Sequence, residues 1–187
     1  MNFLAHIYLS RDDKLLGLSN LVADKIKGKQ YLQYPKKVQQ GVLLHRKIDS
    51  LTDSSPIVYK ATQILFPSYR HFSKVIIDMY FDHFLSNNWE KYHQQKLHVF
   101  TENFSDYALA NKTLFPPNIQ RFIERLVQHQ WLNKYRDLDD LKLILLQMEQ
   151  RIPYNSNLSN SVTELKTNYH YFEGLFFQFF NRLNSIL

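Results

Sequence analysis

The sequence predicts an all-α protein that forms a single helical domain over residues 1–187. Apolar residues recur at intervals of three and four along most of the chain, which is the spacing of one face of an α-helix. No run alternates as a half-buried strand does, and no Asn-Gly or Asp-Gly pair supplies a tight hairpin turn. A length of 187 residues is enough for one domain with a sizeable core.

The expected helices of the first half begin and end at recognisable residues. Asn2 can cap a short first helix, and Gly28 is a typical stop for the second. Pro35 opens the third, and Pro56 stands at the start of the fourth, after the cap-rich stretch SLTDSSP. The predicted ranges are 2–10, 14–27, 35–51 and 56–66.

The second half continues the helical pattern. A long periodic helix is expected where Phe72, Val75, Ile76, Met79 and Tyr80 recur at helical spacing. The pair Pro116–Pro117 breaks the pattern, and the stretch 153–160 is polar and resembles a linker. The last helix is rich in Phe and Tyr, which is typical of a core element, but an exposed helix that binds a partner fits the same pattern. The predicted ranges are 70–92, 94–113, 118–131, 137–151 and from 161 onward.

Composition excludes several classes of site. The chain has no cysteine, so disulfides, thiolate metal ligands and a cysteine nucleophile are ruled out. It has only 4 glycines and neither of the glycine-rich phosphate-binding motifs. The first residues do not resemble a signal peptide, and no apolar run is long enough to insert into a membrane, so we expect a cytoplasmic protein.

The chain is basic, with a net charge of +6 and a pI of about 9.4. This balance favours an acidic partner: nucleic acid, an anionic membrane surface or an acidic protein. The cations are spread out rather than gathered in one run, and an ordinary solvated basic surface explains them equally well.

One unusual cluster lies in the stretch GVLLHRKIDSLTD. On a helix, His45 and Asp49 stand one turn apart on one face, beside the apolar stripe of Leu44, Ile48 and Leu51. The pair therefore lies at the edge of the buried face. Burying charge costs several kcal/mol unless a partner or a metal compensates, so this pair calls for one of the two.

Two further clusters combine carboxylates and histidines. Asp78 and Asp82 are one turn apart on the predicted helix over 70–92, and His83 follows directly. His6 and Asp24 are isolated polar residues within apolar stretches. Carboxylate and imidazole groups together suit a divalent cation such as Mg²⁺, Mn²⁺, Fe²⁺ or Zn²⁺, and a site of this kind serves hydrolysis.

Each of these residues also has a structural interpretation. His6 and His83 can be satisfied core histidines, and Asp78 can pair with a cation one turn away on its helix. Arg46 and Lys47, which follow His45 directly, can bind phosphate oxygens of a substrate or can simply be solvated.

Five stretches taken in order resemble the acyl carrier protein phosphodiesterases, a divergent branch of the HD-type phosphohydrolases. They are MNFLAH at the start, SNLVADKIKG at 19–28, GVLLHRKIDSLTD at 41–53, IDMYFDHFLSNNW at 77–89 and QWLNKYRD at 130–137. The resemblance extends over roughly residues 1–153.

The resemblance implies an HD-like, metal-dependent phosphohydrolase architecture and a divalent cofactor, with Mn²⁺ preferred and Mg²⁺ or Fe²⁺ as alternatives. The implied reaction releases 4′-phosphopantetheine from the serine of holo-acyl carrier protein, an acidic protein substrate, with no nucleic acid involved. Combined with the clusters, it suggests the following roles. The metal ligands are Asp24, His45, Asp82, His6 and His83; the catalytic carboxylates are Asp49 and Asp78; the substrate-binding cations are Arg46 and Lys47.

Two other functions fit the same residues. A metal-dependent nucleotide phosphohydrolase would use the same site on a different substrate. A basic helical module that binds nucleic acid or an acidic protein would need no metal, and its affinity would fall steeply with salt. The sequence leaves the oligomeric state open.

Overall fold

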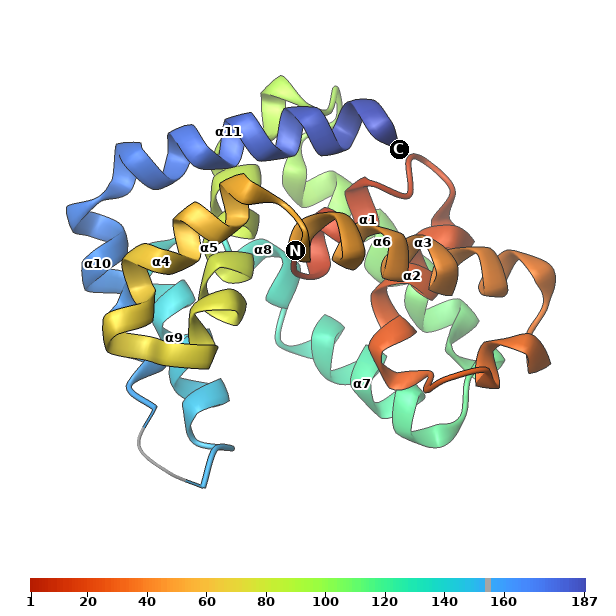
Figure 1. Cartoon of the computed structure of the whole chain (residues 1–187). Coiled ribbons are helices and arrows are strands. Elements are labelled where there is room, and N and C mark those ends of the chain that lie inside the picture. The colour runs from red at the N-terminus through yellow and green to blue at the C-terminus, as the bar shows by residue number, and fades with distance from the viewer. Residues whose placement is uncertain (154–155) are drawn as a thin grey trace. The chain divides into compact units, whose positions relative to one another are not determined.

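The computed structural model describes all residues except 154–155, and the described residues form helices and no strand (Figure 1). The prediction of an all-α protein is confirmed. The α-helices are α1 (Phe3–Tyr8), α2 (Lys14–Val22), α3 (Lys36–Asp53), α4 (Pro56–Tyr69), α5 (Ser73–Asn87), α6 (Leu97–Asn111), α7 (Pro117–Gln128), α8 (Trp131–Lys134), α9 (Leu138–Glu149), α10 (Ser161–Thr167) and α11 (Tyr169–Ile186). Short 3₁₀ helices lie between them: η1 (Ala23–Lys25), η2 (Gln30–Gln33), η3 (Arg70–Phe72), η4 (Trp89–Lys91), η5 (Lys112–Leu114) and η6 (Leu158–Asn160).

The contacts divide the chain into two compact units, each assembled from separate segments. We call Phe3–Ile48 with Asn88–Asn133 the histidine unit, and Met1–Asn2, Asp49–Asn87 and Lys134–Leu187 the aromatic unit. One boundary falls inside α3, which continues without interruption to Asp53. The expectation of one domain over residues 1–187 stays a prediction.

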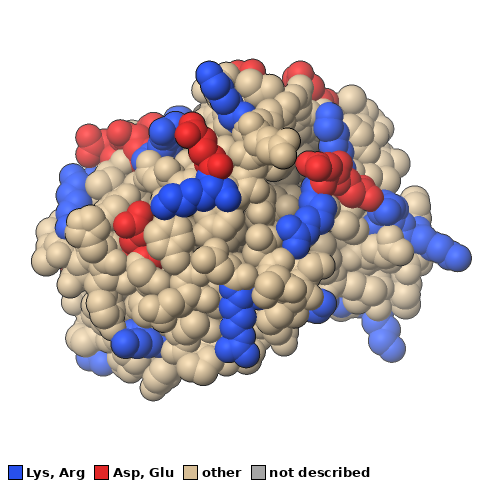
Figure 2. Space-filling view, turned by 90° about the horizontal axis from the view of Figure 1, so that it is seen from above, with Lys and Arg blue, Asp and Glu red and all other residues tan. Residues whose placement is uncertain are grey.

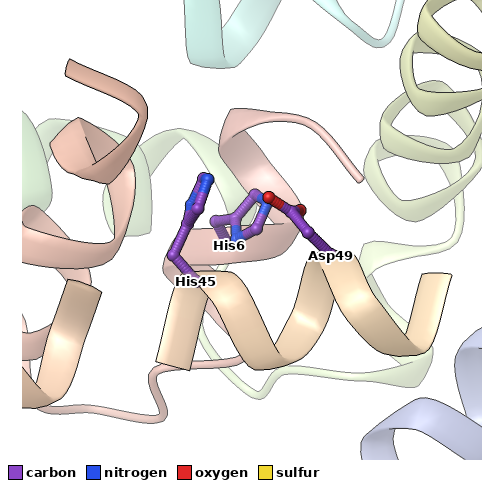
Figure 3. A group of neighbouring side chains, drawn as sticks. All are labelled: His6, His45 and Asp49. Atoms are coloured by element: carbon purple, nitrogen blue, oxygen red, sulfur yellow. The ribbon is translucent and has the colours of Figure 1, made fainter. Parts of the chain in front are cut away.

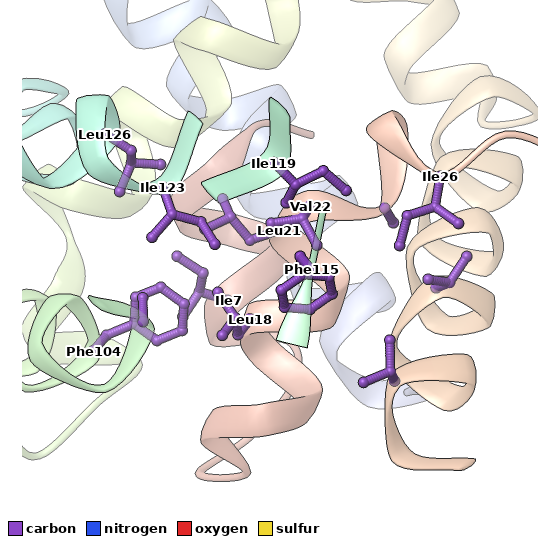
Figure 4. Close-up of a cluster of buried hydrophobic side chains, with 14 of the residues drawn as sticks. Ile7, Leu18, Leu21, Val22, Ile26, Phe104, Phe115, Ile119, Ile123 and Leu126 are labelled. Atoms are coloured by element: carbon purple, nitrogen blue, oxygen red, sulfur yellow. The ribbon is translucent and has the colours of Figure 1, made fainter. Parts of the chain in front are cut away.

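The histidine unit has its own apolar core, drawn in Figure 4. The face of α7 that carries Ile119, Ile123 and Leu126 packs with Leu18 and Phe104 from α2 and α6. These three α7 positions follow the helical spacing of three and four residues, so one stripe of the helix is buried, and Phe122 and Val127 are partly buried beside it. This core holds α1 and α2 in place.

The aromatic unit is built around α5 and α11. The fully buried rings of Phe81 and Phe176 meet edge-on at a centroid distance of 5.8 Å, and those of Tyr80 and Phe172 at 5.2 Å. Edge-to-face pairs of this kind add to the free energy gained by burying their surface. The aromatic C-terminal segment is therefore core, as its composition predicts.

Several expected helices are broken where a tighter turn interrupts them. The helix expected over 14–27 ends at Val22 and continues as η1, and Gly28 then adopts a φ of +52°. The helix expected over 70–92 is divided into η3, α5 and η4. The last one divides into α10 and α11 at Asn168, whose side chain donates to the carbonyl of Glu164.

The stretch 153–160, expected to be a linker, is only partly described, because residues 154–155 lie outside the described residues. Within the described part, Leu158 is fully buried and begins η6. None of the helices that the structure describes combines the length and the apolar character that a membrane span requires.

Helices α2 and α3 lie in close contact because α3 carries a glycine at the crossing. A Cβ atom added to Gly41 would lie 2.4 Å from the Cβ of Ser19 and 2.8 Å from the carbonyl oxygen of Leu16. Neither atom is the flexible end of a side chain. Only glycine therefore permits this approach, which brings Asn20 and His45 together.

We predict that Gly41→Ala lowers the free energy of unfolding by about 1–3 kcal/mol, the usual cost of forcing extra atoms into a packed interface. Urea unfolding measures the change. Gly174→Ala on α11 is the matched control, since its Cβ would meet nothing within 4 Å, and we expect it to stabilise by about 0.5–1 kcal/mol. A neutral Gly41→Ala would contradict the close packing.

Candidate metal centre

The centre begins with two histidines from different helices of the histidine unit. His6 on α1 and His45 on α3 are both buried, with 3% and 6% of their surfaces exposed. Their rings stack at a centroid distance of 4.2 Å and an angle of 22°. Two buried imidazoles in contact require polar partners, because an unsatisfied buried polar group costs free energy.

Asp49 adds a carboxylate from the next turn of α3. One ligand atom from each of His6, His45 and Asp49 lies within 4.8 Å of the other two (Figure 3). The i, i+4 spacing on an unbroken helix places His45 and Asp49 on one face. The pair that the sequence singled out is therefore joined by His6, and no other group of this kind was found among the described residues.

Asn20 on α2 supplies the polar partner of both rings. Its Oδ1 lies 2.8 Å from Nδ1 of His6 and 3.2 Å from Nδ1 of His45. Its Nδ2 donates to the carbonyl oxygen of His6 at 2.8 Å and to Oγ of Ser10 at 3.0 Å. One fully buried amide thus links the two imidazoles to the backbone of α1.

Asp24, a predicted metal ligand, reaches the same cluster from η1. Its Oδ1 lies 2.9 Å from Nε2 of His45, and its side chain is 74% exposed. This carboxylate is therefore at the solvent side of His45. Because α2 ends at Val22 and continues as the tighter turn of η1, Asp24 lies beside the ring of His45.

Asp78 and Asp82, predicted as a catalytic group and a metal ligand, both lie on α5 in the aromatic unit. Asp78 accepts a hydrogen bond of 2.7 Å from the Met1 ammonium group, and Asp82 accepts one of 3.2 Å from the backbone N–H of Asn2. Burial lowers the pKa of the Met1 ammonium, but the attraction of Asp78, helped by Asp82 and Asp49, outweighs burial and leaves this pKa raised.

His83, another predicted ligand, has partners for both ring nitrogens within the aromatic unit. Nδ1 lies 2.7 Å from the carbonyl oxygen of Tyr135, and Nε2 lies 3.1 Å from the hydroxyl of Tyr169. Burial lowers the pKa of His83 below its ordinary value. These contacts are those of a satisfied core histidine.

Arg46 and Lys47, the predicted substrate-binding cations, differ in their surroundings. The guanidinium of Arg46 donates to the carbonyl oxygens of Gly28, at 2.6 Å, and Ile26, at 3.4 Å, and lies 5.0 Å from the ring centre of Tyr31. Lys47 is exposed and has no ion pair in the part of the chain that the structure describes. Arg46 therefore anchors the segment that joins α2 to α3.

Sequence reasoning missed Asn20. Its signal was present: in SNLVADKIKG it is an uncharged polar residue directly before the buried Leu21 and Val22. A polar side chain on a buried helical face must have a partner. The partner could not be named without knowing that α1 and α3 meet there.

The model of the family described as "Acyl carrier protein phosphodiesterase" matches residues 1–183. Relatives with that same name occur in Pectobacterium atrosepticum, at 34% identity over 100% of this chain and 97% of the relative, and in Photorhabdus laumondii, at 36% identity over 96% and 91%. One from Escherichia coli is 34% identical over 98% of this chain and 95% of its own length.

No solved structure matches this chain, so the HD-like architecture stays a prediction. The assignment of the chain to a family does not depend on a matching solved structure. Its model extends over nearly the whole chain, and the relatives align along almost their full length. The chain belongs to the acyl carrier protein phosphodiesterase family.

Proposed function

We propose that this chain hydrolyses the phosphodiester that joins 4′-phosphopantetheine to a serine of holo-acyl carrier protein, with the help of a divalent cation. The observation that carries the proposal is the match of the family over residues 1–183. The products are the apo-protein and free phosphopantetheine. The chain is then a hydrolase that acts on a phosphodiester.

The donor groups of the centre fit a divalent cation. Two imidazoles and a carboxylate come within 4.8 Å of one another, and Asp24 touches His45 from the solvent side. Mixed nitrogen and oxygen donors suit Mn²⁺ and Fe²⁺ better than Mg²⁺, which prefers oxygen alone. When bound, such an ion stabilises negative charge on a phosphoryl oxygen and makes water more acidic.

The residues of the centre then have different roles in binding the cation. His6, His45 and Asp49 hold the cation, and Asp24 holds His45 from outside or completes the ligand set. Asp49, which the sequence suggested as a proton acceptor, is assigned to the cation because its oxygen is grouped with the two histidines. The assignment of Asp78, Asp82 and His83 to the reaction stays a prediction.

The basic balance of the chain suits an acidic protein substrate. On the face drawn in Figure 2, Lys and Arg side chains occur singly among a smaller number of Asp and Glu. In the histidine unit, Lys27, Lys29 and Lys47 are exposed, and they form no ion pair within the described residues. Cations without an internal partner are available to carboxylates of another protein.

We predict that holo-acyl carrier protein loses the mass of its phosphopantetheine group when it is incubated with this protein and Mn²⁺, and keeps it when a chelator is added. Mass spectrometry of the carrier protein measures the result. Parallel reactions contain nucleotides instead. Turnover of nucleotides with an unchanged carrier protein would overturn the proposed substrate.

Asp49→Asn should lower the affinity for Mn²⁺ by at least about tenfold. Removal of a residue that only hydrogen-bonds to a ligand already weakens metal binding by about this factor, and removal of a ligand should weaken it more. Activity should fall with it. Metal content after dialysis, measured by mass spectrometry, checks this. Asp53→Asn is the matched control, one turn further along α3, where the carboxylate pairs with Lys74 at 3.0 Å. Equal losses in both variants would refute the assignment.

Arg46 and Lys47 should give different defects. Lys47→Glu should raise KM about 2- to 5-fold at low salt and leave kcat unchanged. This factor corresponds to the loss of one exposed ion pair with the substrate, which contributes up to about 1 kcal/mol. Arg46→Ala should instead destabilise the fold by about 1 kcal/mol, because two backbone carbonyls lose their donor. Steady-state kinetics and thermal unfolding separate the two. A KM effect confined to Arg46→Ala would reverse the roles.

A further inference from the structure

We propose that the outer side of α3 and the segment that joins α2 to α3 form the docking surface for the acidic carrier protein. Its centre is a pair of exposed leucines, Leu32 and Leu43, and its rim is formed by Lys27, Lys29 and Lys47. We call these five residues the docking face. The inference rests on the proposed function for the identity of the partner, while the surface itself lies wholly within the histidine unit.

Two polar side chains of α3 hold the preceding segment against the helix. The amide of Gln39 donates to the carbonyl oxygen of Leu32 at 3.4 Å. Two turns further along, the guanidinium of Arg46 donates to the carbonyl oxygen of Gly28 at 2.6 Å. Positions 39, 43 and 46 follow the spacing of one helical face, so Leu43 lies between the two attachments. The hydrogen bonds therefore bring the segment that carries Leu32 to the helix face that carries Leu43.

Leu32 is held in an outward position by its neighbours. Tyr31 and Tyr34 pack, partly buried, against the apolar core of the unit, and the carbonyl of Tyr34 accepts a hydrogen bond of 2.8 Å from Gln39. Between these anchors Leu32 is 56% exposed, and Leu43 on α3 is 47% exposed. Single exposed apolar side chains are ordinary, but two large ones on elements bonded to each other form a patch that a partner can cover.

Cations surround the leucine pair. Lys27 and Lys29 precede η2 in the joining segment, and Lys47 follows Leu43 by one turn on the same face of α3. All three lysines are exposed, and no described residue forms an ion pair with any of them. An apolar centre with a polar rim is the usual composition of a protein interface, and a rim of one charge favours a partner of the opposite charge. The occupant that fits is a protein with an apolar side chain among carboxylates.

The docking face borders the solvent side of the metal centre. The joining segment begins at η1, where Asp24 lies 2.9 Å from Nε2 of His45, and continues directly to Lys27 and Lys29. A helix with its side chains is about 10–12 Å across, so the outer side of α3 is about one helix diameter from the ring of His45. A folded protein spans this distance, and one of its serines can approach the centre while its body covers the leucines.

The first test maps where holo-acyl carrier protein binds. ¹H–¹⁵N spectra of the labelled protein are recorded during titration with the carrier protein, in chelator, where the proposed reaction leaves the carrier protein intact. We expect the amide signals of residues 26–34 and 42–48 to shift. Shifts confined to other parts of the chain, or no shift in a large excess of the carrier protein, would overturn the inference.

A variant at the centre of the docking face tests the apolar contact. Leu43→Asp should weaken the binding of holo-acyl carrier protein at least about tenfold, because it removes an apolar contact and sets a carboxylate against an acidic partner. Leu109→Asp on α6 is the matched control at another exposed leucine of the same unit, and we expect less than about a twofold change. Calorimetry measures both, and equal losses would refute the role of Leu43.

Charge reversal tests the rim. The double variant Lys27→Glu with Lys29→Glu should weaken binding about 4- to 25-fold at low salt, as two exposed ion pairs of about 2- to 5-fold each, and much less at high salt. Lys96→Glu, at the start of α6, is the control at an exposed lysine. A loss that does not change with salt, or an equal loss in the control, would contradict the electrostatic role of the rim. Should Leu43→Asp fail to fold, the lysine variants still decide.

These outcomes separate the docking face from the proposed function. Cleavage of holo-acyl carrier protein at unchanged KM by Leu43→Asp and by the lysine double variant would refute the docking face and leave the activity standing. Binding at the docking face without cleavage in Mn²⁺ would remove the activity and leave the surface. A dimer in sedimentation that Leu43→Asp dissociates would assign the leucines to a second copy of this chain and overturn the inference.

Discussion

The histidine unit depends on satisfying two imidazole rings inside an apolar core. His6 and His45 are buried against each other. The side-chain oxygen of Asn20 lies within hydrogen-bond distance of Nδ1 of both rings. Burial without that amide would leave two N–H groups unpaired, at a cost of about 1–3 kcal/mol each. The helices are arranged to avoid this cost: α2 must touch α3, and the glycine at position 41 makes that contact possible.

Other features of the unit follow from the same constraint. Helix α1 is only six residues long, yet the carbonyl and the ring of its His6, and Ser10 in the turn after it, all contact the same asparagine. After Val22, helix α2 continues as the tighter 3₁₀ turn η1, which places Asp24 beside Nε2 of His45. Arg46 follows His45 on α3. Its guanidinium donates hydrogen bonds to backbone carbonyl oxygens just after η1 and so holds that segment in place. The polar groups thus organise the backbone around them.

The aromatic unit supplies its own partners for three polar side chains of α5. The carboxylates of Asp78 and Asp82 are met by the first two residues of the chain, while His83 is held by a backbone carbonyl and a tyrosine hydroxyl. Around them, the rings of α5 and α11 form the core. Asp78, Asp82 and His83 on α5 therefore each have a partner from a distant part of the sequence.

The sequence by itself determined the all-α class and the start of α4 at Pro56, and it favoured the buried aromatic stripe of α11. These follow from local propensities and periodicity, which act over a few residues. It also indicated the pairing of His45 and Asp49, since helical spacing fixes it. Only the tertiary structure decided that His6 joins them and that Asn20 lies behind both rings. Those contacts join residues 14 to 39 positions apart, and no local preference specifies which distant helix supplies the partner of a buried polar group.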